Sequence, residues 1–428
     1  MSKPAALWRR LRLRLDRSLV VIPCLYIVAA VVLGDVAPAL DRGGTGVPGL
    51  DVDGDTARDI LGATATGMIA FTGLVVASVL VVVQFAAGQY SPRLILWFRT
   101  DQFNKHAIGS FLAASLYALV ALRELPKADS PISPELTVGI ALLLLVAASV
   151  LFLALLERVM DHLRPRKVYS RLARAGIHAA RAIYPEAVAG EDAPDQRAWA
   201  VAEPRVVRVA SRPGIIVSFE RDALVAAATR SGVVIELVPG VGEFVARGDA
   251  LLRVHGELPI DDARLRTAVD TSDERTLHQD PAFAMRIIVD TAIRALSPAV
   301  NDPTTAVQAL DVLELLVREL AGRNLEQSVG RGPDGAVRLV WHSPSWEDVL
   351  DLAFDEIRLY GASALQIARR LRAVLEDLRA ATPPRRHPVL DAQLAALDAA
   401  VAAAFPAGSA DLVAALRADR MGLGLARP

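Results

Sequence analysis

The sequence is poor in several residue types from which binding and catalytic sites are commonly built. Its single cysteine, Cys24, excludes an intramolecular disulfide framework and a cysteine cluster for metal. Lysine is scarce although arginine is abundant, and the lysines are Lys3, Lys105, Lys127 and Lys167. Charge of neither sign prevails, with 47 Lys+Arg against 48 Asp+Glu, so the composition gives no indication of nucleic-acid binding. No motif places a nucleophile beside a base, so we predict no catalytic residue, metal or cofactor, and no reaction class is favoured.

Hydrophobic residues, in contrast, make up 53% of the chain, which indicates membrane spans. Charge is absent from the cores of four stretches long enough to cross a bilayer, and these predict spans at about residues 18–36, 61–88, 106–123 and 136–157. The first stretch has an apolar run longer than that of a signal peptide and is followed by three more. We therefore interpret it as a retained helix, and cleavage near Ala37-Pro38-Ala39 is the alternative. Residues 1–165 are predicted to form the transmembrane domain.

The loops between these spans differ in charge, which predicts the orientation of the protein. Basic residues precede the first span, and the loop that follows it is rich in aspartate. Positive charge returns in the second loop and again after the fourth span, from Arg158 to Arg174. Because positive charge marks the cytoplasmic side, we expect both termini and all residues after the fourth span to be cytoplasmic.

The second span carries small and weakly polar residues at helical spacing. Steps of three and four place them on one stripe of a helix. The stripe comprises Ala63, Thr66, Gly67, Ala70, Gly73, Ala77 and Gln84. It either packs tightly within the bundle or lines a pore at the axis of a homo-oligomer. No ionisable residue lies in the core of any predicted span, which disfavours an ion-coupled pump and leaves passive conductance open. After the span, residues 89–98 ("QYSPRLILWF") predict a proline-broken turn into an interfacial segment.

The remaining chain is predicted to contain three parts. Residues 166–200 form a linker helix and loop, residues 201–257 a small β module, and residues 258–428 a helical domain. The stretch "SGVVIELVPGVGEFVARGDALLRV" resembles half of a biotinyl- or lipoyl-type barrel-sandwich domain, with Gly242 and Gly248 in its turns. The β module contains no lysine, so we interpret it as a structural module and not as a carrier of a swinging arm.

Two Asp-Pro pairs, Asp280-Pro281 and Asp302-Pro303, each predict the start of a helix, because aspartate caps free amides and proline suits the first helical position. Residues 297–305 are therefore predicted to be a tight corner between two helices. Hydroxyls and an arginine near a helix N-terminus can also bind an anion. The candidate ligand or subunit contacts are Arg275, His278, Asp280, Ser297, Asn301, Asp302, Thr304 and Thr305. The stretch is therefore either a structural corner or a ligand or subunit contact, and catalysis is the least favoured alternative because no nucleophile–base motif supports it.

The chain contains four characteristic stretches in the order "QFAAGQYSPRLI", "GVGEFVARGD", "RTLHQDPAFAMRIIVDTAIRALSPAVNDPTTA" and "WEDVLDLAFDEIRLYG". With these stretches it resembles a family of predicted bacterial membrane proteins, domain of unknown function 2254. The resemblance extends along nearly the whole chain. It implies a protein of the bacterial inner membrane with an N-terminal helical bundle and a cytoplasmic C-terminal region, and it supplies no activity and no catalytic residues.

The expected fold class is thus a membrane protein with an α-helical transmembrane bundle of four spans. A cytoplasmic α+β region follows, with a small barrel-sandwich-like β module and a helical C-terminal domain. We predict partners in the lipid bilayer and in further copies of the chain, and none in nucleic acid. The favoured function is an oligomeric channel or pore with a cytoplasmic regulatory domain. The alternative is a membrane-anchored sensor or scaffold that binds a small anionic ligand or a protein partner.

Overall fold

The computed structural model describes residues 18, 20–43, 52–89, 102–125, 133–162, 164–185, 203–210, 213–258, 260–325 and 328–421, without the side chains of residues 86–89 and 162. The chain divides into two compact units, Met1–Arg164 and Pro165–Pro428. The interfacial segment predicted after the second span lies, except for its first residue, outside the described residues.

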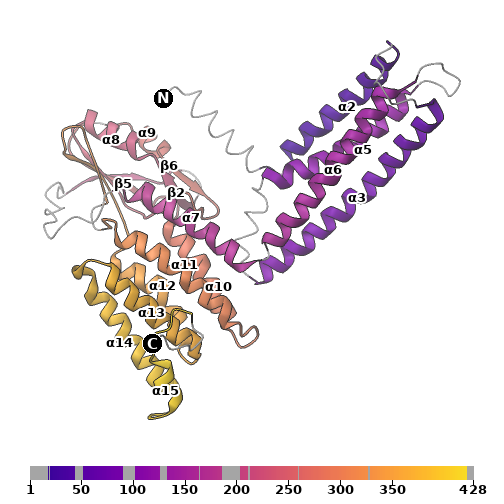
Figure 1. Ribbon diagram of the computed structural model, residues 1–428. Helices are drawn as coiled ribbons and strands as arrows, with labels where there is room; N and C mark the ends of the chain where they lie inside the picture. The colour runs from indigo at the N-terminus through magenta and orange to yellow at the C-terminus, as the bar shows by residue number, and fades with distance from the viewer. Residues whose placement is uncertain are drawn as a thin grey trace. The chain divides into compact units, whose positions relative to one another are not determined.

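The first unit is a bundle of helices, each long and apolar enough to cross a membrane, which confirms the four predicted spans. The helices are α2 (Val21–Asp41), α3 (Gly54–Gln89), α5 (Gln102–Glu124) and α6 (Glu135–His162). Helix α5 contacts each of the other three (Figure 1). Within the apolar window of α5, 61% of the residues are buried, against 17–28% in the other three helices. Helix α5 is therefore the centre of the bundle.

Glycines allow α2 and α5 to approach each other closely. A Cβ atom on Gly34 of α2 would lie 2.8 Å from Cβ of Val120, and one on Gly109 of α5 would lie 2.8 Å from Cδ2 of Tyr26. Such contacts leave no room for a side chain. Small residues at these two positions therefore set the distance between the helices, as is usual in lipid.

The helices extend past the predicted spans and carry buried polar residues near their ends. Asp41, in the last turn of α2, is 5% exposed and accepts hydrogen bonds from the Leu136 and Thr137 amides, both at 3.0 Å. It thereby caps the N-terminus of α6 from a neighbouring helix. Tyr117 of α5 donates to the Thr137 carbonyl oxygen at 2.8 Å. Lys105, in the first turn of α5, is also fully buried.

The second unit contains two sheets. Their strands are β1 (Arg205–Arg208), β2 (Gly214–Phe219), β3 (Val234–Leu237), β4 (Phe244–Val245), β5 (Ala250–His255), β6 (Val269–Ser272), β7 (Val329–Arg331) and β8 (Val337–Trp341). One sheet has the order β1-β5-β3-β8-β7 with only β3 and β8 parallel, and the other has the order β4-β2-β6. Helix α8 (Arg221–Arg230) packs on the larger sheet. Phe219 of β2 and Trp341 of β8 join the sheets, with ring centroids 5.4 Å apart.

The sheets extend beyond residue 257, the predicted boundary between the β module and the helical domain. Strands β6, β7 and β8 lie beyond it, and β8 inserts beside β3 through a parallel pairing that brings Ile235 opposite Leu339. Parallel pairing between strands about a hundred residues apart leaves no local signal in the sequence. The second unit is therefore a mixed α/β region, and the barrel-sandwich likeness describes only the local turns at Gly242 and Gly248.

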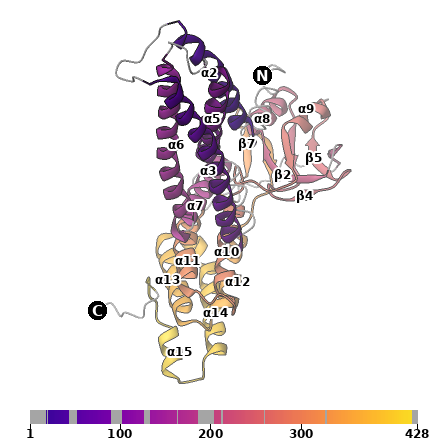
Figure 2. The same cartoon turned by 90° about the vertical axis from the view of Figure 1, so that its right-hand side faces the viewer.

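The helices of the second unit are α7 (Pro165–Ile183), α9 (Asp262–Thr267), α10 (Pro281–Ala295), α11 (Pro303–Ala321), α12 (Trp346–Gly361), α13 (Leu365–Ala381), the 3₁₀ turn η2 (Pro384–Arg386), α14 (His387–Ala404) and α15 (Ala410–Ala415). Helices α10 and α11 contact each other and α7, and they also contact α12 and α13, against which α14 packs (Figure 2). Helix α12 ends at Gly361, and α13 begins at Leu365. A Cβ atom on Gly361 would overlap Ile367, so the chain folds back at this glycine.

Candidate functional site

The predicted stripe on the second span lies on α3, and the structure places it on the outward side of that helix. The face of α3 packed against its own bundle consists of Leu61, Ala65, Met68, Thr72 and Val75, all at most 7% exposed. Each stripe residue is exposed: Ala63, Thr66, Gly67, Ala70, Gly73, Ala77 and Gln84. Most stripe residues come two positions after a residue of the packed face. Two residues correspond to about 200° around a helix of 3.6 residues per turn, so the stripe lies on the side of α3 opposite the packed face. The stripe therefore does not pack against the other helices of its own bundle. Its interpretation as a packing surface within one copy of the chain is wrong.

The outward stripe is also open. A Cβ atom added to Gly67 or Gly73 would meet no atom within 4 Å among the residues described. This contrasts with Gly34 and Gly109, where an added Cβ atom would lie 2.8 Å from a side chain of a neighbouring helix. Large apolar side chains flank the stripe, including Ile69 and Leu74 at 58% and 66% exposure. The small residues of α3 thus form a strip without bulky side chains, on a surface whose other side chains are large, apolar and suited to contact with lipid.

The predicted corner between two helices is confirmed in the second unit. Asp302 caps α11 by accepting from the Thr305 amide at 3.1 Å and from the Thr305 hydroxyl at 2.5 Å. The Ser297 carbonyl accepts from the Asn301 amide at 2.8 Å, which closes the turn. Asn301 has a φ of 47°, the left-handed region that asparagine tolerates better than most residues. Asn301 and Thr304 are exposed, and the hydroxyl of Thr305 is used by the cap.

The other three candidate residues do not join this corner. Asp280 caps the start of α10, whereas Ser297 follows its end. A helix of 15 residues separates them by about 22 Å at 1.5 Å per residue. His278 is exposed near the start of α10. The expectation that Arg275, His278 and Asp280 approach the Asn301 corner is therefore not met, because α10 is straight and intact between the two groups.

Arg275 and Asp280 instead form a junction between α10 and the smaller sheet. Asp280 is 3% exposed, and its Oδ1 accepts from the Phe283 amide at 2.8 Å. Its Oδ2 accepts from Nη2 and Nε of Arg275 at 2.7 and 2.9 Å. Burial raises the pKa of Asp280, and the guanidinium of Arg275 opposes that rise. The Arg275 guanidinium carbon also lies 5.0 Å from the centre of the Phe283 ring.

Two further contacts hold this junction against β2. Gly242, in the turn before β4, has a φ of 94°, and a Cβ atom there would lie 2.5 Å from Arg275 Nη2 and 2.6 Å from Asp280 Oδ2. The Gln279 side chain pairs with the Phe219 backbone in both directions, accepting from its amide at 2.9 Å and donating to its carbonyl at 3.2 Å. Two stretches quoted for the family resemblance, around residues 240–249 and 275–285, thus meet in space. Nothing in their spacing along the chain predicts this.

The chemistry of this junction is that of a structural link. The Asp280 carboxylate accepts hydrogen bonds from a guanidinium and from a helix amide. No nucleophilic side chain lies beside a base among the residues that form the junction, which are Arg275, Asp280, Gly242 and Gln279. Over the part of the chain that the structure describes, no group of three or more His, Cys, Asp or Glu side chains is placed to hold a metal ion.

Four candidate spans followed by a region of two sheets and packed helices define a multi-pass membrane protein. The family of predicted membrane proteins DUF2254 matches residues 16–377, and the chain belongs to it. It is similar to the uncharacterized protein Rv1290c of Mycobacterium tuberculosis (strain ATCC 25618 / H37Rv), with 26% identity over 355 residues, which cover 79% of this chain and 67% of the relative. The uncharacterized protein Mb1321c of Mycobacterium bovis is similar to the same extent. No solved structure matches the chain.

Proposed function

We propose that copies of this chain assemble in the membrane through α3 and form a passive pore lined by its outward stripe. The observation that carries the proposal is the orientation of α3. Its small and weakly polar residues face away from its own bundle, opposite the packed residues Leu61, Met68 and Val75. A helix face that meets only lipid gains nothing from glycine, threonine and glutamine, whereas a face that meets another helix or water does.

The length and composition of α3 support the same proposal. At 36 residues it is about 54 Å long, well beyond the ~30 Å hydrocarbon core of a bilayer. Thr66 and Gln84 lie on the stripe, and no charged residue lies between them. A lining of this kind would let ions or small solutes pass without binding them tightly. It offers no ionisable group for a coupled transport cycle.

The loop charges support an orientation with both termini in the cytoplasm of a bacterial cell, in the inner membrane. In this arrangement the second unit, from Pro165 onward, is the cytoplasmic part of the channel and is suited to regulate it. Asp41, which caps α6, then lies at the outer end of the bundle, and Lys105 lies at the inner end.

Single-channel recording from the full-length protein in liposomes, with and without membrane tension, tests the proposal. We expect discrete openings from the unmodified protein and a changed conductance from Ala70→Trp, because the indole would occupy the lining. Leu153→Trp is the matched control, since Leu153 is 65% exposed on α6 and lies off the stripe. It should conduct as the unmodified protein does.

Oligomeric state must be measured on the same samples, by chemical cross-linking or native mass spectrometry. Silence under tension and voltage from an intact oligomer would overturn the pore and leave α3 as an assembly surface. A monomer in the bilayer would overturn both parts of the proposal. Loss of the oligomer in Ala70→Trp, together with its conductance, would assign the stripe to packing between copies.

A further inference from the structure

Helix α7 carries positive charge that its own residues do not offset. Its 19 residues include Arg166, Lys167, Arg171, Arg174 and Arg181 and no aspartate or glutamate. Helices α10 and α11, against which α7 packs, carry charged residues of both signs. Of these three packed helices, α7 is therefore the one with positive charge only.

Three arginines in the first half of α7 face away from the protein. Each of Arg166, Arg171 and Arg174 lies two positions from a buried residue of α7, which is about 200° around the helix. The buried face packs so closely that a Cβ atom on Gly176 would lie 2.7 Å from Cδ2 of Leu316 in α11. Arg166 and Arg174 are exposed, and Arg171 is half-buried. These three arginines form the basic face of α7.

The basic face has no carboxylate partner among the residues that the structure describes. Its three arginines make no ion pair within the described ranges, whereas arginines on either side of them do. Arg164 lies 3.9 Å from Asp161, and Arg181, in the last turn of α7, pairs with Glu319 at 2.9 Å. The basic face is thus open to an anion from outside the chain.

The connection to α6 brings the start of this face to the membrane. Helix α6 ends at His162 and α7 begins at Pro165, and three residues of chain reach at most about 10 Å. With 28 residues, α6 is about 42 Å long, which matches the thickness of a bilayer with its headgroups. Chain connectivity alone therefore places Arg166 close to the lipid headgroups.

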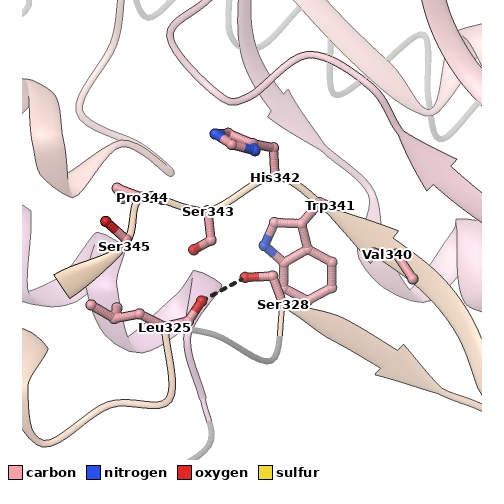
Figure 3. A pocket seen from close by; sticks show the side chains of 8 residues that line it. All are labelled: Leu325, Ser328, Val340, Trp341, His342, Ser343, Pro344 and Ser345. Atoms are coloured by element: carbon pink, nitrogen blue, oxygen red, sulfur yellow. Dashed lines mark hydrogen bonds between the residues drawn. The ribbon is translucent and has the colours of Figure 1, made fainter. Parts of the chain in front are cut away.

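A cavity in the second unit offers no comparable charge. Its volume is about 350 Å³, and it lies where the larger sheet ends and α12 begins (Figure 3). No lysine, arginine or carboxylate side chain is among the residues that line it, and the Ser328 hydroxyl there donates to the Leu325 carbonyl oxygen at 3.4 Å. The basic face is therefore better suited than this cavity to attract an anion.

Anionic lipids match the basic face in charge and in chemistry. A guanidinium group binds phosphate through two parallel N–H donors, and each arginine near an anionic bilayer strengthens the attraction about fivefold. Because α10 and α11 cover the apolar face of α7, this helix does not insert into the acyl chains as a free amphipathic helix does. We propose that the basic face of α7 binds the headgroup phosphates of anionic lipids. The contact is independent of the stripe on α3 and of a pore.

Modification of arginines by phenylglyoxal, in the full-length protein reconstituted in lipid nanodiscs, tests the proposal. The reaction is followed by peptide mass spectrometry in phosphatidylcholine alone and with phosphatidylglycerol added. We expect modification of the basic face to slow at least fivefold in the anionic nanodiscs, and the protection to disappear at high salt. Arg385 and Arg417, which are exposed elsewhere in the second unit, should react equally in both lipids.

A matched pair of variants tests the same contact by affinity. Arg166→Gln/Arg174→Gln should bind phosphatidylglycerol at least tenfold more weakly, measured by native mass spectrometry of the protein titrated in neutral detergent. Arg385→Gln/Arg417→Gln removes the same charge and should bind as the unmodified protein does. Equal modification in the two lipids, equal protection of the control arginines, or equal affinities of the two variants would overturn the proposal. Protection by free phosphate in neutral nanodiscs would assign the face to a soluble anion and overturn it as well.

Discussion

Asp280 uses its two carboxylate oxygens for different tasks, and Arg275 binds only one of them. Oδ2 accepts two hydrogen bonds from the Arg275 guanidinium, at 2.7 and 2.9 Å, while Oδ1 caps α10 through the Phe283 amide. One buried side chain therefore ties the start of a helix to the segment that precedes it, and Gly242 presses the turn before β4 against both. Substitutions at these three positions should consequently change the stability of the second unit.

Asp280→Ala removes both the cap and the ion pair, whereas Asp280→Asn keeps an oxygen that can cap. We expect a loss of unfolding free energy of about 3 kcal/mol for alanine and about 1–2 kcal/mol for asparagine. The values lie below those for a fully buried pair because Arg275 is 30% exposed and can be hydrated. Denaturant unfolding in detergent, followed by circular dichroism, measures the difference. Equal losses in the two variants would show that the cap contributes nothing.

Gly242 and Gly248 form a matched pair for testing the junction, because both have a φ of 94°. A Cβ atom on Gly248 would meet nothing within 4 Å among the residues described, whereas one on Gly242 would lie 2.5 Å from Arg275 Nη2. Gly248→Ala should cost only the backbone strain, about 1–2 kcal/mol. Gly242→Ala should cost clearly more, because the Arg275–Asp280 pair must move. Similar melting temperatures for the two variants would contradict this account of the junction.

Local features of this fold were predictable from the sequence because local physics determines them. Uninterrupted apolar runs gave the four spans, and the Asp-Pro pairs gave the starts of α10 and α11. Ser345, a residue type that favours helix N-caps, caps α12, and the Ser345 amide donates in return to Asp348. The Gly-Pro-Asp-Gly stretch between β7 and β8 likewise consists of residue types that favour turns.

Contacts between distant segments were not predictable in this way. No pattern in the chain indicates that β8 pairs with β3, or that Gly242 meets Arg275. The same limit explains the incorrect grouping of Arg275 with Asn301, since both are polar residues near helix ends and only the length of α10 separates them. For α3 the sequence located the stripe, but only the burial of Leu61, Met68 and Val75 shows that it points outward.

The corner at Asn301 tests whether backbone geometry or side-chain chemistry determines the residue there. At a φ of 47°, glycine should be tolerated within about 0.5 kcal/mol, whereas valine, branched at Cβ, should cost about 2 kcal/mol or more. Asp302→Ala should cost about 1 kcal/mol through loss of the cap on α11. Thermal unfolding of the three variants gives the comparison. A stable Asn301→Gly protein with altered channel activity would indicate a role for the amide beyond the turn.

Glycines on two membrane helices should differ sharply in their tolerance of leucine. Gly109→Leu should disrupt the bundle, because even a Cβ atom there would lie 2.8 Å from the Tyr26 ring. Gly73→Leu should leave each copy folded, since the space outside Gly73 is open, and should lower the conductance of the pore instead. Size-exclusion chromatography and single-channel recording distinguish the two effects. A Gly73→Leu protein that unfolds as readily as Gly109→Leu would show that the stripe packs within one copy after all.

The pH dependence of stability should involve the contact between α7 and α11. Arg181 donates to both carboxylate oxygens of Glu319, at 3.1 and 2.9 Å, and this pairing lowers the pKa of Glu319 from its usual 4.5. A carboxyl group whose pKa is lower in the folded state stabilises the fold above its unfolded pKa, and the contribution is lost as pH falls through the folded value. Glu319→Gln should therefore be less stable than the unmodified protein at pH 7, and the difference in melting temperature should shrink between pH 5 and pH 3. Asp222→Asn, at a carboxylate that is 95% exposed, controls for the general effect of removing a negative charge. A difference for Glu319→Gln that stays constant over this range would mean that its carboxylate has no charge-dependent role in holding α7 to α11.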